Sequence, residues 1–182
     1  MEEAMLKYIF KLIVSIFCFL CLVSVAEVWA AANMFTGTLG CSTIGPSHPE
    51  HTEASGEFLF ELDESKRELT YKINVENIEN AYMAHLHVGP CDEQAQTKEE
   101  PLKQGPIAVW LYSCNSQEGP DQCIKGEFTG TLAEGVIKPE DLKNNILFVD
   151  LIKAMRGGYA YVNVHTKKYI TCEICGRVMP AQ

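Results

Sequence analysis

Hydrophobic and polar residues alternate along most of the chain after residue 33. In 56–62 every second position is apolar and glutamates stand between, and 68–75 repeats the pattern with a second apolar face. A period of two is typical of antiparallel strands that bury one face. The charged segment 63–67 between the two runs predicts a turn, so the two strands should form a hairpin.

The same period, bounded by glycine, proline and polar clusters, predicts six further strands. The polar loops at 41–56, 89–106 and 113–122 are too short to separate two domains, so one domain is expected over about 34–179. This organisation is typical of an all-β fold, an antiparallel β-sandwich or a Greek-key barrel. The additional strands are expected at 34–39, 83–88, 107–112, 124–131, 159–165 and 172–179.

One segment has a helical pattern instead. Pro-Glu-Asp at 139–141 is typical of a first helical turn, where a proline is tolerated and acidic side chains oppose the helix dipole. Leu147, Leu151 and Met155 then follow at helical spacing, and a glycine pair at 157–158 ends the pattern. We expect one short helix, or two, within 139–156, with the apolar side chains packed on the core.

The first thirty residues have the pattern of a signal peptide. Lys7 and Lys11 precede an apolar run at 12–26, and small residues follow at positions that a signal peptidase reads. The run is shorter than the ~20 residues that span a bilayer, so cleavage after Ala30 or Ala32 is favoured over a retained anchor. The mature domain is therefore expected to be secreted, periplasmic or extracellular, with membrane contact only through this segment.

Charge and motifs exclude several classes of protein. The chain has 15 Lys+Arg against 24 Asp+Glu, a formal net charge of −9, which argues against a nucleic-acid-binding surface. It contains no glycine-rich phosphate loop, no GxSxG and no HExxH. No nucleophile–base pair is visible, so the sequence favours a protein without catalytic activity and leaves the matter open.

Six cysteines follow the predicted cleavage site, and an even number in an exported domain indicates disulfides. Cys114 and Cys123 flank a short loop and are the favoured pair. Cys172 and Cys175 have the CxxC spacing, but in a strand residues three apart point to opposite faces. A thiol redox protein is therefore the weakest hypothesis. Four cysteines remain for two further disulfides, and the sequence does not specify how they pair. They are Cys41, Cys91, Cys172 and Cys175.

Three histidines share one predicted face. In 83–88 the alternation places His85 and His87 together, opposite Leu86 and its apolar neighbours. In 159–165 it places His165 opposite the alanine and valines of that strand. If the two strands are neighbours, three imidazoles converge on the outer face of the sheet. Neutral imidazoles suit copper or zinc, and we favour copper.

His48 and His51 lie in a loop that could add a ligand. In an alternative hypothesis no metal binds, and the histidines form a hydrogen-bonded network with Asn163 and Thr166 that holds the sheet. The domain would then be a non-catalytic extracellular module that binds another protein.

Four more side chains belong to these hypotheses. Trp110 and Tyr112 are candidate contact residues for a protein partner, because exposed aromatic patches mark such surfaces. Glu173 and Arg177 share one face of the last predicted strand, which predicts a surface salt bridge between them.

Four segments, taken together and in this order, resemble the CHRD domain, first described in chordin and found in many bacterial exported proteins. The resemblance covers about 34–179. It implies an immunoglobulin-like or superoxide-dismutase-like β-sandwich outside the cytoplasm and brings no settled activity, although in chordin the domains belong to an extracellular growth-factor antagonist. The segments are AHLHVGP (84–90), GPIAV (105–109), GYAYVNVHT (158–166) and EICGRV (173–178).

The chain also departs from the family pattern. Where the family usually has Gly-Glu-Ile-Arg-Gly, residues 172–176 read Cys-Glu-Ile-Cys-Gly, which implies a variant stabilised by disulfides. The His-x-His strand is also similar to the copper-binding strand of copper/zinc superoxide dismutase. The resemblance is short and does not extend to the other ligands of that enzyme.

Overall fold

A computed structural model describes residues 33–41, 49, 51–89, 104–114 and 123–181. Within them the fold is all-β, with a nine-stranded sheet and one short α-helix, α2 (Phe148–Arg156), preceded by the 3-10 turn η2 (Pro139–Asp141). The strands are β1 (Met34–Cys41), β2 (Ser55–Asp63), β3 (Glu68–Glu79), β4 (Ala81–Val88), β5 (Ile107–Ser113), β6 (Glu127–Ile137), β7 (Ala160–Thr166), β8 (Ile174–Arg177) and β9 (Met179–Pro180).

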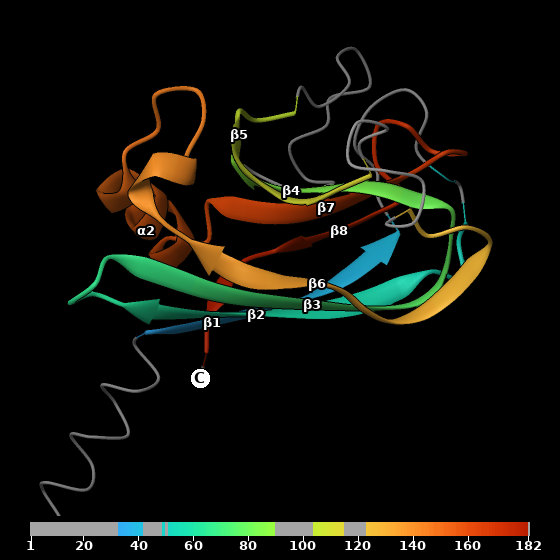
Figure 1. Ribbon diagram of the computed structural model, residues 1–182, viewed down its shortest axis with the longest axis horizontal. Coiled ribbons are helices and arrows are strands. Elements are labelled where there is room, and N and C mark those ends of the chain that lie inside the picture. The colour runs from blue at the N-terminus through green and yellow to red at the C-terminus, as the bar shows by residue number, and fades with distance from the viewer. Residues whose placement is uncertain (1–32, 42–48, 50, 90–103, 115–122, 182) are drawn as a thin grey trace, which may run out of the picture.

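The strands follow the order β5-β4-β7-β8-β1-β2-β3-β6 with antiparallel pairing, and β9 pairs with β1. Figure 1 shows β4, β5, β7 and β8 as one layer over β1, β2, β3 and β6, with α2 at one end. The layers join where β1 pairs with β8 through only Gly40–Cys175 and Cys41–Ile174. The sheet bends at this narrow seam and nearly closes on itself. The predicted all-β antiparallel class is confirmed.

The core fills the space between the two layers. The predicted hairpin is present: β2 pairs with β3 from Ser55–Glu76 to Asp63–Glu68, and the apolar positions of both strands point inward. Leu86 of β4 and Val162 of β7 are fully buried in the same core. Removal of such side chains from water is the main favourable term in folding, so this burial fixes which face of β4 and β7 is left for the histidines.

Two predicted strands have different bounds. The strand expected at 124–131 runs instead over β6, 127–137. Ile73 pairs with Ala133 and Asn74 with Thr131, so Leu132 is an extra residue that interrupts the alternation. The strand expected at 172–179 begins at Ile174 and is divided into β8 and β9.

The helical segment consists of two pieces, as the pattern allowed. Leu151 and Met155 are fully buried, which confirms the core-facing stripe. Leu147 was wrongly placed in that stripe: it is the N-cap, has an extended backbone and is 62% exposed. Phe148 and Ile152 are buried on the helix as well. Within the described residues no helix is both long and apolar enough to cross a membrane.

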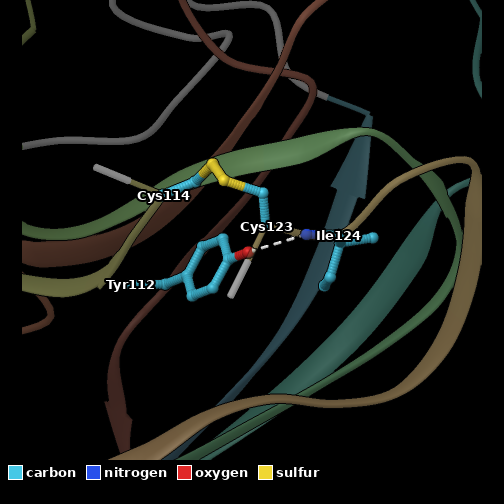
Figure 2. The surroundings of a disulfide bond; sticks show 4 residues. All are labelled: Tyr112, Cys114, Cys123 and Ile124. Atoms are coloured by element: carbon cyan, nitrogen blue, oxygen red, sulfur yellow. Dashed lines mark hydrogen bonds between the residues drawn. A yellow bond between two sulfur atoms is a disulfide. The ribbon is translucent and has the colours of Figure 1, made fainter. Parts of the chain in front are cut away.

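The favoured disulfide is confirmed. Cys114 and Cys123 are bonded, and beside them Tyr112 accepts a hydrogen bond at Oη from the Ile124 backbone N–H at 3.2 Å (Figure 2). The bridge ties the end of β5 to the segment that leads into β6. Tyr112, one of the two candidate contact residues for a protein partner, is therefore half-buried beside the disulfide.

The other cysteines differ from the prediction of two further bridges. Cys175 is disulfide-bonded. The thiol of Cys172, however, donates a hydrogen bond to the Ile174 carbonyl at 3.1 Å, and that of Cys41 donates to the Pro49 carbonyl at 3.4 Å. Cys172 and Cys175 thus do not form the dithiol pair that a redox protein would need. Cys91, His48 and the predicted signal peptide at 1–30 lie outside the described residues.

Candidate metal site

The register of β4 and β7 brings the three histidines together. The strands are antiparallel neighbours, with His85 opposite Asn163 and His165 opposite Met83. The face of β4 that carries His85 and His87 therefore continues onto β7. One potential ligand atom from each of the three histidines lies within 4.8 Å of the others. The predicted convergence, on the side of the sheet opposite the core, is confirmed.

At the histidines this outer face is covered and not open to solvent. His85, His87 and His165 are 3%, 1% and 3% exposed. Aromatic rings lie against the imidazoles: Tyr161 stacks on His87 with centroids 4.8 Å apart and planes inclined by 7°. Trp110, the cross-strand partner of His85, meets it edge to face at 4.6 Å. The site is therefore a buried cluster of imidazoles with aromatic rings packed against it.

The hydrogen bonds fix the tautomer of each histidine. Nδ1 of His87 lies 2.7 Å from the Gly105 carbonyl, and Nδ1 of His165 lies 2.9 Å from the Ile170 carbonyl. A carbonyl oxygen only accepts, so both Nδ1 atoms carry the proton and both Nε2 atoms keep a lone pair. His165 Nε2 is 3.0 Å from His85 Nδ1, so His85 donates from Nδ1 and its Nε2 also keeps a lone pair. The Nε2 lone pairs of His85 and His87 are therefore open to a ligand, whereas that of His165 accepts the His85 Nδ1–H and can bind an ion only when this hydrogen bond breaks.

Several buried polar atoms in this site have no hydrogen-bond partner among the described residues. They are Nε2 of His85, Nε2 of His87, and both amide atoms of Asn163. A buried polar atom without a partner costs about 1–3 kcal/mol, so such atoms are uncommon unless a ligand or an ordered water completes them. Two of these atoms are imidazole lone pairs, which are metal ligands by their chemistry. Of the predicted sheet-holding network, the hydrogen bond between His85 and His165 is present.

Burial also sets the charge of the site. Desolvation, with a smaller contribution from the neighbouring histidines, lowers the pKa of His85 to about 3. Desolvation likewise lowers the pKa of His165 to about 4 and lowers the pKa of His87. The three rings are therefore neutral at physiological pH. Protons do not compete for the ligand atoms, as they do at an exposed histidine.

The segment that supplies the Ile170 carbonyl is anchored by a buried carboxylate. Glu173 is 7% exposed, and its oxygens accept hydrogen bonds from the hydroxyls of Thr166 and Thr52, each at 2.6 Å. Thr166 also accepts from the Tyr169 backbone N–H at 3.2 Å. The surface salt bridge predicted for Glu173 is replaced by this buried clasp. Thr166 likewise bonds Glu173, not the histidines.

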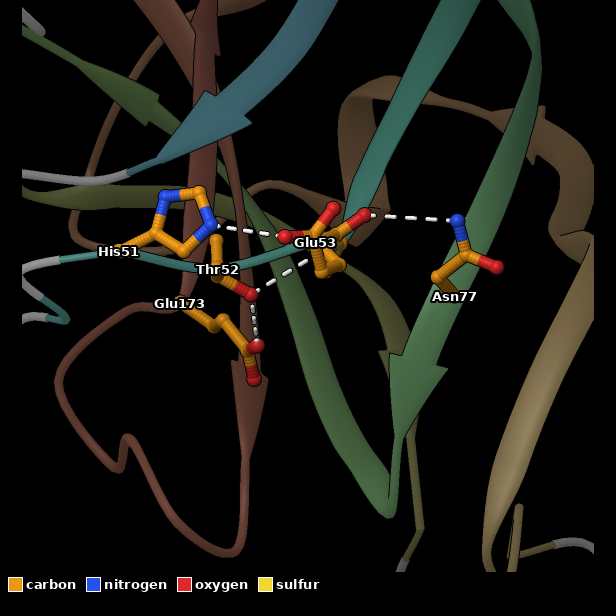
Figure 3. A network of polar contacts seen from close by, with 6 residues as sticks. His51, Thr52, Glu53, Asn77 and Glu173 are labelled. Carbon is orange, nitrogen blue, oxygen red and sulfur yellow. Dashed lines mark hydrogen bonds and ion pairs between the residues drawn. The ribbon is translucent and has the colours of Figure 1, made fainter.

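The remaining candidates lie apart from this group. His51 is exposed and pairs with Glu53, with 2.7 Å between Nε2 and Oε1 (Figure 3). The same figure shows Thr52 directed toward Glu173 on the other side of the segment. His51 is not one of the grouped ligands. Trp110 is 43% exposed, as a contact residue would be, but it also contacts His85.

Sequence reasoning missed two parts of the site and gave a third no role. The alternation in 159–165 places Tyr161 on the face of Asn163 and His165, but it does not predict that the Tyr161 ring stacks on His87. The carbonyls of Gly105 and Ile170, which fix two tautomers, have no signal in the side-chain pattern because every residue carries a carbonyl.

Comparison with known families completes the site. A family model described as the CHRD domain matches residues 36–178, which is most of the chain and includes all three histidines. The chain belongs to the CHRD family. This confirms the resemblance drawn from the four sequence segments. No curated protein and no solved structure matches the chain.

Proposed function

We propose that this CHRD domain binds one metal ion through His85, His87 and His165, and that copper is favoured over zinc. The observation that carries the proposal is the convergence of three neutral imidazoles, two of which bury a lone pair without a partner among the described residues. A metal ion would satisfy those atoms. Storage, transfer or redox chemistry of the metal are all compatible with the site.

The donor set fits a first-row metal. Imidazole nitrogen suits copper and zinc, and copper stands highest in the affinity order of divalent ions. The Nδ1–H groups of His87 and His165 donate to backbone carbonyls, as ligating histidines commonly do. Three nitrogens that bind one ion at about 2.1 Å in a trigonal set are about 3.6 Å apart, so ligand atoms separated by up to 4.8 Å have to close by about 1 Å. Side-chain rotation can supply such a shift.

We also propose an exported location, secreted, periplasmic or extracellular. The support is the Cys114–Cys123 disulfide, since disulfides persist in oxidising compartments, together with the family. For the fold in finer detail we propose the immunoglobulin-like or superoxide-dismutase-like sandwich, supported by the two facing layers in Figure 1.

The test is metal content. The mature domain, purified from an oxidising compartment and titrated with copper, should hold about one equivalent. His85→Ala and His165→Ala should both lose it, and His51→Ala, which alters an exposed histidine, should keep it. No bound metal, with folding unchanged in both site variants, would leave the disulfide-stabilised module for an extracellular protein partner as the function.

A further inference from the structure

We infer that the three-histidine site is built for copper in its monovalent state, Cu⁺, in preference to Cu²⁺ or Zn²⁺. The inference rests on the proposed function, and it specifies the ion that the same residues select. The supporting observations are the charge of the donors, the burial of the site and the groups packed against it.

The site contributes no negative charge to a bound ion. All three ligands are neutral imidazoles. The Nδ1–H groups of His87 and His165 donate to the carbonyls of Gly105 and Ile170, and that of His85 donates to His165 Nε2 until an ion takes that atom. A carboxylate in those positions would make the rings stronger ligands for a divalent ion. Among the described residues Glu173 is the buried carboxylate, and threonine hydroxyls occupy both of its oxygens. A bound ion therefore keeps its full charge.

Burial of the site makes a charged ion costly to bind, and this desolvation cost grows with the square of the ion's charge. The Born cost of moving an ion from water into a low-dielectric pocket grows with the square of its charge, so a divalent ion pays about four times as much as a monovalent ion of equal size. The three histidines are at most 3% exposed. With no neighbouring anion to offset the cost, the site favours the ion of lower charge.

Coordination number points the same way. Zn²⁺ is bound by four ligands, and Cu²⁺ prefers a tetragonal set. The site brings together three ligating side chains, and beside them lie the rings of Tyr161 and Trp110. The buried Asn163 amide is also near, but it is neutral, and a carbonyl-type oxygen suits Mg²⁺ or Ca²⁺ more than zinc or copper. Tyr161 Oη accepts a hydrogen bond from the Gly105 N–H at 3.2 Å, which engages the hydroxyl outside the ligand group. A three-coordinate monovalent ion needs no further ligand from the protein.

The fluorescence of Trp110 provides a readout of metal binding at His85. The chain has two tryptophans, Trp29 within the predicted signal peptide and Trp110. In the mature domain Trp110 is therefore the one indole, and it meets the His85 ring at 4.6 Å between centroids. An ion bound by His85 should quench its fluorescence. Trp110→Phe keeps an aromatic ring at this position and should abolish the signal without abolishing binding.

The experiment compares three ions on one protein. The metal-free mature domain is titrated under anaerobic conditions with Cu⁺ buffered by a bathocuproine chelator, and separately with buffered Zn²⁺ and Cu²⁺. We expect one Cu⁺ per chain, bound at least about a hundredfold more tightly than either divalent ion, with quenching of Trp110. His87→Asn should lose Cu⁺ binding, and His51→Ala should match the unaltered domain.

Two negative results would lead to different conclusions. Tighter binding of Zn²⁺ or Cu²⁺ than of Cu⁺ at the same histidines would overturn the selectivity and leave the proposed metal site standing. The absence of binding by all three ions, in a domain whose circular dichroism shows it folded, would remove both.

Discussion

At the scale of single residues, the partner of Nδ1 and the degree of burial separate one histidine from another. His51 is exposed, lies beside Glu53 and behaves as a surface residue. His87 and His165 are buried, and each donates a hydrogen bond from Nδ1–H to a backbone carbonyl. Nε2 of each ring is therefore an acceptor with a defined direction. The same residue type therefore has two different chemistries, and its environment decides between them.

The buried histidines predict how stability depends on pH. Their folded-state pKa values lie below the ordinary 6.5, at about 3 for His85 and about 4 for His165. Between pH 6.5 and 4 the unfolded chain binds protons that the folded chain refuses, so acid favours unfolding. The free energy of unfolding of the metal-free domain should be constant above about pH 7 and should fall as the pH drops through 6.5 toward 4. Urea unfolding at a series of pH values measures this, and a flat profile between pH 7 and 5 would contradict it.

Asn163 offers a second residue-scale prediction. Both of its amide atoms are buried without a hydrogen-bond partner among the described residues. Asn163→Leu replaces these atoms with apolar ones of similar size, so the metal-free domain should become more stable by about 1–2 kcal/mol. Chemical denaturation measures the change. A loss of stability of the same size would show that an ordered water or another group satisfies the amide.

At the scale of elements, the clasp between β7 and β8 keeps the site in register. Thr166 at the end of β7 and Thr52 before β2 both donate to Glu173, so one carboxylate ties three segments of chain together. The Ile170 carbonyl that orients His165 belongs to the segment between Thr166 and Glu173. The element that presents the carbonyl is therefore held at both of its ends.

Thr166→Val tests the clasp. It removes a buried hydroxyl and leaves one oxygen of Glu173 without its donor, so the domain should lose about 1–3 kcal/mol of stability. Thr131→Val is the matched control, because that hydroxyl makes an exposed hydrogen bond to Asn74 and its loss should cost less than about 0.5 kcal/mol. Equal effects of the two variants on the urea midpoint would argue against a clasp.

At the scale of the whole molecule, a single sheet folds over itself and closes around one core. Its layers are joined by the narrow β8–β1 seam, and the histidine site lies on the opposite face of the β4–β7 pair. The Cys114–Cys123 disulfide is located at the end of β5, beyond the residue that contacts His85. The disulfide that stabilises the fold and the histidines that form the candidate metal site therefore lie in different parts of the molecule.

Removal of the disulfide should lower the stability of the domain without removing the metal site. The loop it closes spans a sequence separation of 9, for which the chain-entropy model gives about 2–3 kcal/mol. Cys114→Ala with Cys123→Ala should lower the free energy of unfolding by that amount and keep the copper stoichiometry of the native domain. Loss of copper from a folded double variant would show that the bridge also positions Trp110 or the ligands.

The alternation of residue types is a local property, and the sequence alone was enough to read it. It determined the antiparallel strands, the hairpin of β2 and β3, and the shared face of His85 and His87. It failed at Leu132, where one extra residue in β6 breaks the period, and at Leu147, where the helix begins one residue later than the stripe suggested. Both errors occur at an irregularity of the backbone, which side-chain type does not encode.

Only the tertiary structure decided the nature of the site. The pairing of β4 with β7 joins residues about eighty positions apart, and no local pattern specifies that contact. The burial of the histidines depends on what packs over them, including Tyr161 and Trp110, and their tautomers depend on the carbonyls of Gly105 and Ile170. The sequence determined which face the imidazoles occupy. The packing around that face made them buried, neutral and directed at one another, because desolvation and hydrogen bonding act through neighbours in space.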